Sequence, residues 1–262
     1  MKLTPASSSR CTPVSTKGHF IKSLPALVVV ALSGVHADNP GEIHYPDLKP
    51  LPASDIRVQN DRSTHQQFLR FSSIMANLGD GPLEVFARNN AVTGTTDAYQ
   101  RLFTHDSSGN WVVAGTNYVG TFAFHPQHNH WHFENFALYQ LRNVASDGSV
   151  GSTVIATSDK VSFCMTDSVL IDSNLAHASP QTYVTCDVST PQGISVGWGD
   201  LYSWYLAGQS LNITGLPTGD YWLVIFADPD GRLLEGGAIG NNSSAVKIRL
   251  SKGNKVRVIQ TL

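Results

Sequence analysis

The sequence of 262 residues has few charged residues, few cysteines and no long hydrophobic run. Charged residues make up 15% of the chain, and the formal net charge is −2. Because a protein that binds nucleic acid needs a basic surface to neutralise phosphates, nucleic acid is not expected as a partner. The longest apolar segment, "LPALVVVALSGV" (Leu24 to Val35), has 12 residues. A helix that crosses a bilayer needs about 20 residues, so no membrane span is predicted.

This short apolar segment is typical of a secretory signal. Lys17 and Lys22 precede it and "VHA" follows it. A basic flank, an apolar core and small residues at the exit describe such a signal. We expect residues 1–37 to be removed and Asp38 to begin the mature chain. A short membrane anchor is the alternative. Export would make the protein secreted or extracellular, or periplasmic if the source is bacterial.

The three cysteines divide between the signal and the mature chain. Cys11 lies in the predicted signal, which leaves Cys164 and Cys186. Two cysteines in an exported protein favour one disulfide bond. A free buried thiol is the alternative that the sequence leaves open.

The rest of the chain is typical of a mainly β protein. Residues 38–60 are rich in proline and polar groups and predict an extended lead-in. After them come short apolar segments separated by turn signals, such as "YQRLFTHDSSGNWVVAG", which predicts a hairpin with "DSSGN" as its turn. Glycine and proline together (22 and 13) are frequent, and few segments keep a 3.6-residue period. The prediction is a β-sandwich with long functional loops.

The stretch "HPQHNHWHF", residues 125 to 133, holds four of the ten histidines. Its last three, His128, His130 and His132, alternate with other residues and would share one face of an extended strand. On a helix His130 would point away from the other two. Because imidazole nitrogen binds copper, zinc, iron and nickel, the pattern predicts a metal site. Acid–base chemistry and simple packing are the alternatives.

Two other metalloprotein classes fit part of the same stretch. The first half of a cupin motif fits His128, His130 and Glu134, but the second half needs a histidine three residues after Pro-x-Gly. Here "PTG" at residues 217–219 is followed by Asp, Tyr and Trp. A zinc hydrolase would need a carboxylate base beside the metal, and Glu134 would share the face of His132 if the strand continues.

Three blocks of the sequence resemble the lysyl oxidase family of exported, copper-dependent amine oxidases. "FHPQHNHWH" is similar to the family's copper motif, Trp-His-x-Cys-His-x-His-x-His, with Phe124 for the tryptophan and Gln127 for the cysteine. "DKVSFCMTD" resembles His-Lys-x-Ser-Phe-Cys-x-x-Asp, and "QGISVGWGDLY" resembles Gln-Gly-Ile-x-x-Gly-x-x-Asp-x-Tyr. The resemblance implies that the copper(II) ligands are His128, His130 and His132. It also implies a catalytic domain over residues 45–262.

The resemblance assigns the cofactor to two residues of the chain itself. It implies that Lys160 and Tyr202 form lysine tyrosylquinone, and that the protein oxidises primary amines such as peptidyl lysine. The products would be an aldehyde, hydrogen peroxide and ammonia, with molecular oxygen as the electron acceptor. Asp200 lies two residues from Tyr202, on the same side of an extended chain, and is the first candidate for the catalytic base. Asp167 is the second, although an acid in a turn also serves as a structural cap.

The sequence departs from the family pattern at the positions where some members bind calcium. Some members bind calcium through Asp-Leu near the start and Glu-x-Asp-x-x-Asn-Asn near the end. Asp47-Leu48 matches, but in "EGGAIGNN" Gly237 replaces the acid and one residue is inserted, which weakens a calcium site. Glycosylation sequons, meaningful in a eukaryotic secretory route, compete with calcium there. They begin at Asn212, Asn241 and Asn242. An exported copper-binding β-sandwich without catalysis is the alternative to an enzyme.

Overall fold

The computed structural model describes residues 41–126, 129–237 and 239–262. The predicted signal and the predicted copper ligand His128 lie outside these residues. The described part holds sixteen strands and a single 3-10 helix, η1 (Ile239–Asn241). None of its helices is long and apolar enough to cross a membrane. The prediction of a mainly β fold is confirmed.

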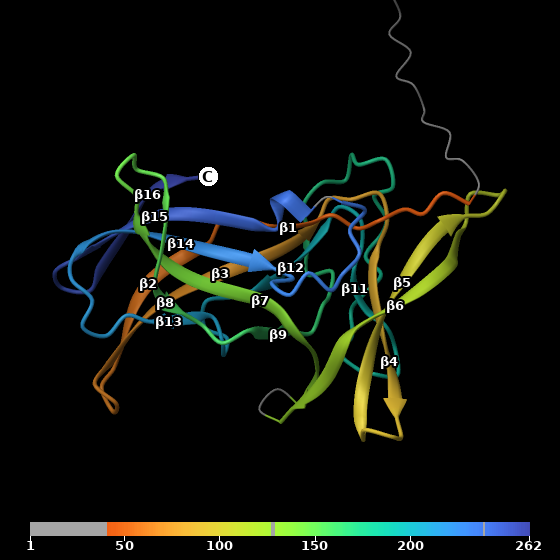
Figure 1. Ribbon diagram of the computed structural model, residues 1–262, viewed down its shortest axis with the longest axis horizontal. Coiled ribbons are helices and arrows are strands. Elements are labelled where there is room, and N and C mark those ends of the chain that lie inside the picture. The colour runs from red at the N-terminus through yellow and green to blue at the C-terminus, as the bar shows by residue number, and fades with distance from the viewer. Residues whose placement is uncertain (1–40, 127–128, 238) are drawn as a thin grey trace, which may run out of the picture. The chain divides into compact units, whose positions relative to one another are not determined.

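The strands form two antiparallel sheets (Figure 1). The smaller sheet has the order β1-β3-β12-β10, with β2 and β13 also paired to β3. Its six strands are β1 (Leu48–Pro50), β2 (Ser54–Asp61), β3 (Gln66–Asn77), β10 (Val169–Leu170), β12 (Trp198–Tyr202) and β13 (Ser210–Asn212).

The larger sheet has the order β11-β4-β5-β6-β7-β14-β15-β16, with β8 and β9 also paired to β7. In Figure 1, β4 to β6 form one end of this sheet and β14 to β16 the other. Its ten strands are β4 (Leu83–Asn90), β5 (Thr95–His105), β6 (Trp111–His125), β7 (His130–Val144), β8 (Val150–Thr157), β9 (Val161–Phe163), β11 (Gln192–Ile194), β14 (Gly219–Ala227), β15 (Ser243–Ser251) and β16 (Lys255–Thr261).

A shared apolar core joins the two sheets, as in a β-sandwich. Phe71 on β3 contacts Tyr139 on β7 edge-to-face, with ring centroids 4.9 Å apart. The Tyr139 hydroxyl lies 3.0 Å from the Ser73 hydroxyl and accepts a hydrogen bond from Gln209 at 2.7 Å. Burial of these polar groups is acceptable because each is paired. The sandwich prediction is confirmed.

Turn chemistry explains the longest hairpin, which positions the histidine motif. In "DSSGN", Asp106 accepts the backbone N–H groups of Ser108 and Asn110 at 2.8 and 2.9 Å, and Gly109 has φ 79°. Asp and Gly at these positions favour a tight reversal. β5 and β6 therefore pair along most of their length and carry His125 to the far end of β6.

Candidate functional site

The histidine motif lies on a hairpin and not on one strand. β6 ends at His125, β7 begins at His130, and these two residues are opposite each other in the antiparallel pair. The sequence predicted an extended strand for His128, His130 and His132, and the structure places the last two of these on β7. The shared-face prediction is confirmed for His130 and His132, which are two residues apart on β7. His128 is outside the described residues.

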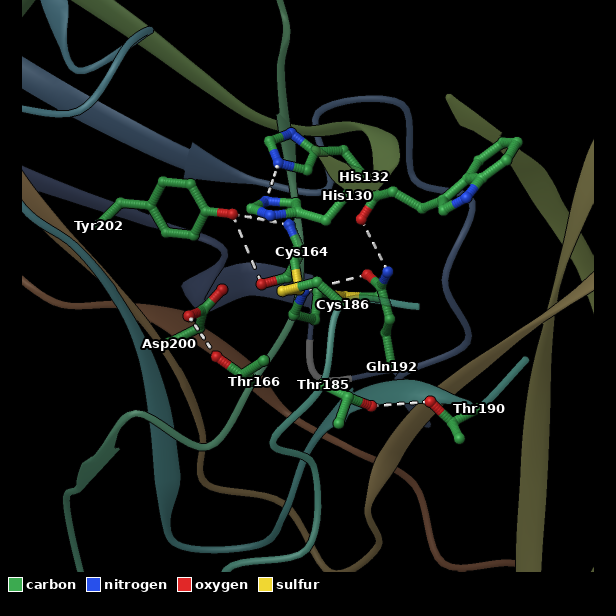
Figure 2. The surroundings of a disulfide bond; sticks show 12 residues. His130, His132, Cys164, Thr166, Thr185, Cys186, Thr190, Gln192, Asp200 and Tyr202 are labelled. Carbon is green, nitrogen blue, oxygen red and sulfur yellow. Dashed lines mark hydrogen bonds between the residues drawn. A yellow bond between two sulfur atoms is a disulfide. The ribbon is translucent and has the colours of Figure 1, made fainter. Parts of the chain in front are cut away.

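The imidazole rings of His130 and His132 lie next to each other (Figure 2). The Nε2 atoms of His130 and His132 are 2.8 Å apart, and the His125 ring stacks on His132 with centroids 4.9 Å apart. His132 is only 3% exposed. Two Nε2 atoms that face each other at this distance fit either a hydrogen bond between neutral rings or two ligands of one ion. Within the described residues no group of three His, Cys, Asp or Glu is arranged around a metal position.

Backbone contacts of Trp131 fix the orientation of the two histidines that flank it. The Trp131 N–H donates to the Cys186 carbonyl at 3.0 Å, and its carbonyl accepts the Gln192 side-chain amide at 2.8 Å. Cys186 is held in turn by the disulfide bond to Cys164, with Cα atoms 5.4 Å apart. The predicted disulfide is confirmed. It ties the loop after β9 to the histidine strand.

The glycines of "QGISVGWGDLY" have structural roles. A side chain at Gly193 would place a Cβ 2.2 Å from the Leu83 carbonyl oxygen, because β11 pairs closely with β4. Gly197 has φ 82°, which an L-residue adopts only with strain, and its Cβ would meet the Asp172 carbonyl. These glycines let the loop turn back into β12, which carries Asp200 and Tyr202.

Tyr202 is buried in the core at the end of β12. Its ring stacks on Phe163 with centroids 3.7 Å apart, and its hydroxyl accepts the Cys164 backbone N–H at 2.6 Å. Burial, and then the charge of nearby Asp200, raise the pKa of Tyr202 well above its usual value. The phenol is therefore neutral at physiological pH.

Lys160 and Tyr202 line the same cavity, which has a volume of about 300 Å³ and also includes His125 and His132 in its wall. The Lys160 amine forms an ion pair with Asp230, which lies in the loop after β14. Arg232 pairs with the other oxygen of Asp230 at 3.0 Å. Sequence analysis missed Asp230, because "ADPDG" signals only a turn and lies 70 residues from Lys160.

The two candidate bases have different environments. Asp167 accepts four hydrogen bonds, from the backbone of Thr182, Tyr183 and Ser195 and from the Ser195 hydroxyl, at 2.7 to 3.0 Å. It is a structural cap that holds the 164–191 loop. Asp200 is 2% exposed, and one of its oxygens has no hydrogen-bond partner among the described residues. Burial raises the pKa of Asp200 well above its usual value.

The third acidic candidate, Glu134, is hydrogen-bonded to a residue of the neighbouring strand. Its carboxylate accepts the Thr121 hydroxyl on β6 at 2.6 Å. Glu134 is also absent from the described residues that line the cavity of His132. Glu134 is therefore not placed as the base that the zinc-hydrolase alternative assigned to it.

The residues that matched the calcium pattern come together near η1. Asp47 accepts the Asn241 side-chain amide at 2.8 Å, and Glu235 accepts that of Asn242 at 2.6 Å. The amide oxygens of Asn241 and Asn242 are buried, with no hydrogen-bond partner in the described part of the chain. Four oxygen-bearing side chains, two of them with unsatisfied oxygens, are a donor set that suits calcium.

Comparison with known proteins agrees with this geometry. The lysyl oxidase family model matches residues 104–260, more than half of the chain. Lysyl oxidase homolog 2 of Gallus gallus is 29% identical over 148 residues, and that of Homo sapiens is 28% identical over 150. Each match covers 55% of this chain and 18% of the relative. Lysyl oxidase homolog 3A of Danio rerio is 27% identical over 172 residues, or 65% of this chain and 18% of the relative.

The chain thus spans less than a fifth of the length of these relatives. The matched region nonetheless contains the disulfide and also His125, His132, Lys160 and Tyr202, which line one cavity. The chain belongs to the lysyl oxidase family.

Proposed function

We propose that this protein is a copper-dependent amine oxidase whose quinone cofactor is built from Lys160 and Tyr202. The observation that carries the proposal is that both residues line one cavity with His132, although 42 positions separate them in the sequence. A lysine or a buried tyrosine on its own would not indicate a quinone cofactor. Copper amine oxidase chemistry is that of the family to which the chain belongs.

In this proposal His128, His130 and His132 hold copper(II). The facing Nε2 atoms of the last two fit this role. Copper would supply, with dioxygen, the oxidation that builds lysine tyrosylquinone from Lys160 and Tyr202, and this cofactor would supply the electron acceptor for the substrate amine. The chain itself keeps the Tyr202 ring fixed against Phe163 and holds its hydroxyl on the Cys164 N–H.

Asp200 is the proposed proton acceptor. Its carboxyl group is on the same side of β12 as Tyr202, since the exposed Leu201 separates the two buried residues. A base that takes a proton from carbon works best when its pKa is near the working pH. Burial raises the pKa of Asp200 in this direction.

The substrates in this proposal are a primary amine, such as the side chain of peptidyl lysine, and molecular oxygen. Secretion is also part of the proposal. The Cys164–Cys186 disulfide supports it, because disulfide bonds persist in oxidising compartments and are rare in the cytosol.

Peptide mass mapping tests the proposal directly. The protein is loaded with copper in air, digested, and searched for one species that joins the Lys160 and Tyr202 peptides. Its presence, together with peroxide release that depends on added amine, is the expected result. If both peptides are recovered separate and unmodified, the protein is better explained as an exported copper-binding module without turnover.

Asp230→Asn is expected to accelerate formation of this crosslink about fivefold. The Lys160 amine must leave Asp230 before it reaches the Tyr202 ring, and a partly exposed ion pair is worth at most about 1 kcal/mol, or roughly a factor of five. The time course of the crosslinked peptide after copper addition measures the effect. Arg232→Gln is the matched control, because it leaves Lys160 paired. Slower crosslinking in Asp230→Asn would mean instead that Asp230 guides the amine toward the ring.

A structural calcium ion near η1 also belongs to the proposed function. Asp47, Glu235, Asn241 and Asn242 would hold it. Gly237 supplies no carboxylate, so the site is expected to be weaker than one with a third acid. The side chains of Asn241 and Asn242 are engaged with the two acids, whereas Asn212 is exposed. A glycan is therefore expected at Asn212 and not at the other two sequons.

Without calcium, stability is expected to fall as the pH rises from about 4.5 to 7. Burial raises the pKa of Glu235 from 4.5 to about 7, so the folded protein keeps a proton that the unfolded chain releases. The free energy of unfolding then falls through this window by at most roughly 3 kcal/mol. Thermal unfolding in a chelator at several pH values measures how the stability depends on pH. Glu235→Gln should remove most of this dependence. Added calcium should stabilise the wild type more at pH 8 than at pH 5. The same pH dependence of stability in the wild type and in Glu235→Gln would contradict the prediction.

A further inference from the structure

A groove opens between two strands that form free edges of the two sheets. Among the described residues, β2 pairs only with β3, and β16 pairs only with β15. The groove between β2 and β16 has a volume of about 490 Å³. In Figure 1 both strands lie toward the same end of the sandwich. An unpaired strand edge exposes backbone N–H and C=O groups, so it can accept a further strand.

Hydrogen bonds of Gln67 on β3 hold the two edges near each other. Its side-chain amide donates to Asn254 Oδ1 in the β15–β16 turn at 2.6 Å, and to Asn60 Oδ1 on β2 at 3.1 Å. Asn254 has φ 62°, a left-handed conformation that asparagine tolerates in a tight turn. The groove is therefore held open by the fold itself.

The larger sheet extends beyond the smaller one at this groove. Val256 and Val258 on β16 pair with Leu250 and Ile248 on β15, which are both buried in the core. Directly paired residues of neighbouring strands lie on the same face of a sheet, so the two valines are on the core side. Val258 is nonetheless 51% exposed. A further strand added to the edge of β2 would cover this side of β16.

The wall of the groove combines apolar and basic side chains. Three of its residues pack against the core and three are exposed cations: Ile56, Val58 and Val256, and Arg57, Lys255 and Arg257. None of the described residues that line the groove is acidic. No salt bridge in the described part of the chain includes any of the three cations. Opposite charges on neighbouring strands stabilise a sheet, so this wall favours a strand that carries acidic residues.

The charges also argue against a second copy of this chain as the occupant. If two β16 strands paired, Lys255 and Arg257 would bring like charges together, which destabilises a strand pair. Cations on an edge strand commonly prevent such pairing. They do not explain the exposed valine on the core side, which an added acidic strand would cover.

We propose that the groove between β2 and β16 binds an extended segment of a partner protein in which acidic and apolar residues alternate. The segment adds to β2 as a strand through backbone hydrogen bonds. Its apolar side chains cover Val256 and Val258, and its acidic side chains lie near the three cations. The inference is independent of the proposed function, because no residue of the groove lines the cavity of Lys160 and Tyr202.

Fluorescence anisotropy with a labelled peptide tests the proposal on the whole protein. The probe is a peptide of alternating glutamate and valine with eight residues, the length of β2. We expect it to bind, and a counterpart with lysine in place of glutamate to bind at least about tenfold more weakly. The bound peptide should also slow hydrogen exchange of backbone amides in residues 54–61, since alternate N–H groups of the free edge gain hydrogen bonds.

Three variants separate charge from packing. Lys255→Glu combined with Arg257→Glu should weaken binding of the acidic peptide about tenfold, because attraction becomes repulsion. Val258→Lys adds a cation but removes an apolar contact, and it should also weaken binding. Arg88→Glu, at an exposed position on β4, is the matched control for charge reversal and should leave binding unchanged. Thermal unfolding checks that each variant is folded.

The proposal is overturned if the acidic peptide does not bind, if the basic peptide binds equally well, or if the double charge reversal binds like wild type. Stronger binding to Val258→Lys would also overturn it, because the peptide would then only sense a basic surface. Sedimentation tests the other occupant. A wild-type dimer that Val258→Lys dissociates would assign the groove to a second copy of this chain and overturn the proposal.

Discussion

Tyr202→Phe is expected to abolish amine-dependent peroxide release while copper stays bound. Without the phenol oxygen the ring cannot become a quinone, so the rate should fall to that of the uncatalysed reaction, a loss of at least about 10⁶-fold. The fold should persist, because the phenyl ring still stacks on Phe163. The buried Cys164 N–H loses its acceptor, which costs about 1–3 kcal/mol of stability. Peroxide release, copper content and thermal unfolding are the measurements.

Tyr139→Phe is the matched control for this experiment. Tyr139 is another fully buried tyrosine of the same core, and its hydroxyl is hydrogen-bonded to Ser73 and Gln209. Its loss should cost similar stability and leave the crosslink and the peroxide release in place. If Tyr202→Phe still produces peroxide from an added amine at the wild-type rate, the quinone is not built on Tyr202.

His132→Ala is expected to remove copper from the protein and, with it, the crosslink. The His132 ring is buried between His125 and His130, and its Nε2 atom faces that of His130. Loss of a residue that only supports a metal ligand already weakens binding by about 10–100-fold, so loss of a ligand should weaken it by more than about a hundredfold. Copper content after dialysis and the electron paramagnetic resonance spectrum measure the effect.

The chain offers a matched histidine control at the opposite end of β6. There His44, His105 and His177 gather around Trp111, with the His105 ring centroid 3.9 Å from that of Trp111. His177→Ala removes one imidazole from this second cluster, and copper content should not change. Retention of copper by His132→Ala would mean that the hairpin is not the metal site.

Local features of the sequence were enough for the parts of the site that lie within one element. The alternation of polar and apolar residues predicted that His130 and His132 share a face, and that Asp200 and Tyr202 do, because side chains alternate along any strand. Turn residues predicted the β5–β6 hairpin and its "DSSGN" reversal. The alternation did not predict that the chain reverses between His125 and His130, since nothing in it marks that point.

The sequence by itself thus determined the mainly β sandwich, the cysteine pair and the resemblance of three blocks to one family. The tertiary structure alone decided which of these residues meet. It paired Lys160 with Asp230, made Asp167 a structural cap, left one oxygen of Asp200 without a hydrogen-bond partner among the described residues, and let Tyr202 line two cavities. The physical reason is that side-chain direction within a strand follows from the local backbone. Which strands and loops become neighbours depends on packing two sheets around a common core, a property of the whole chain.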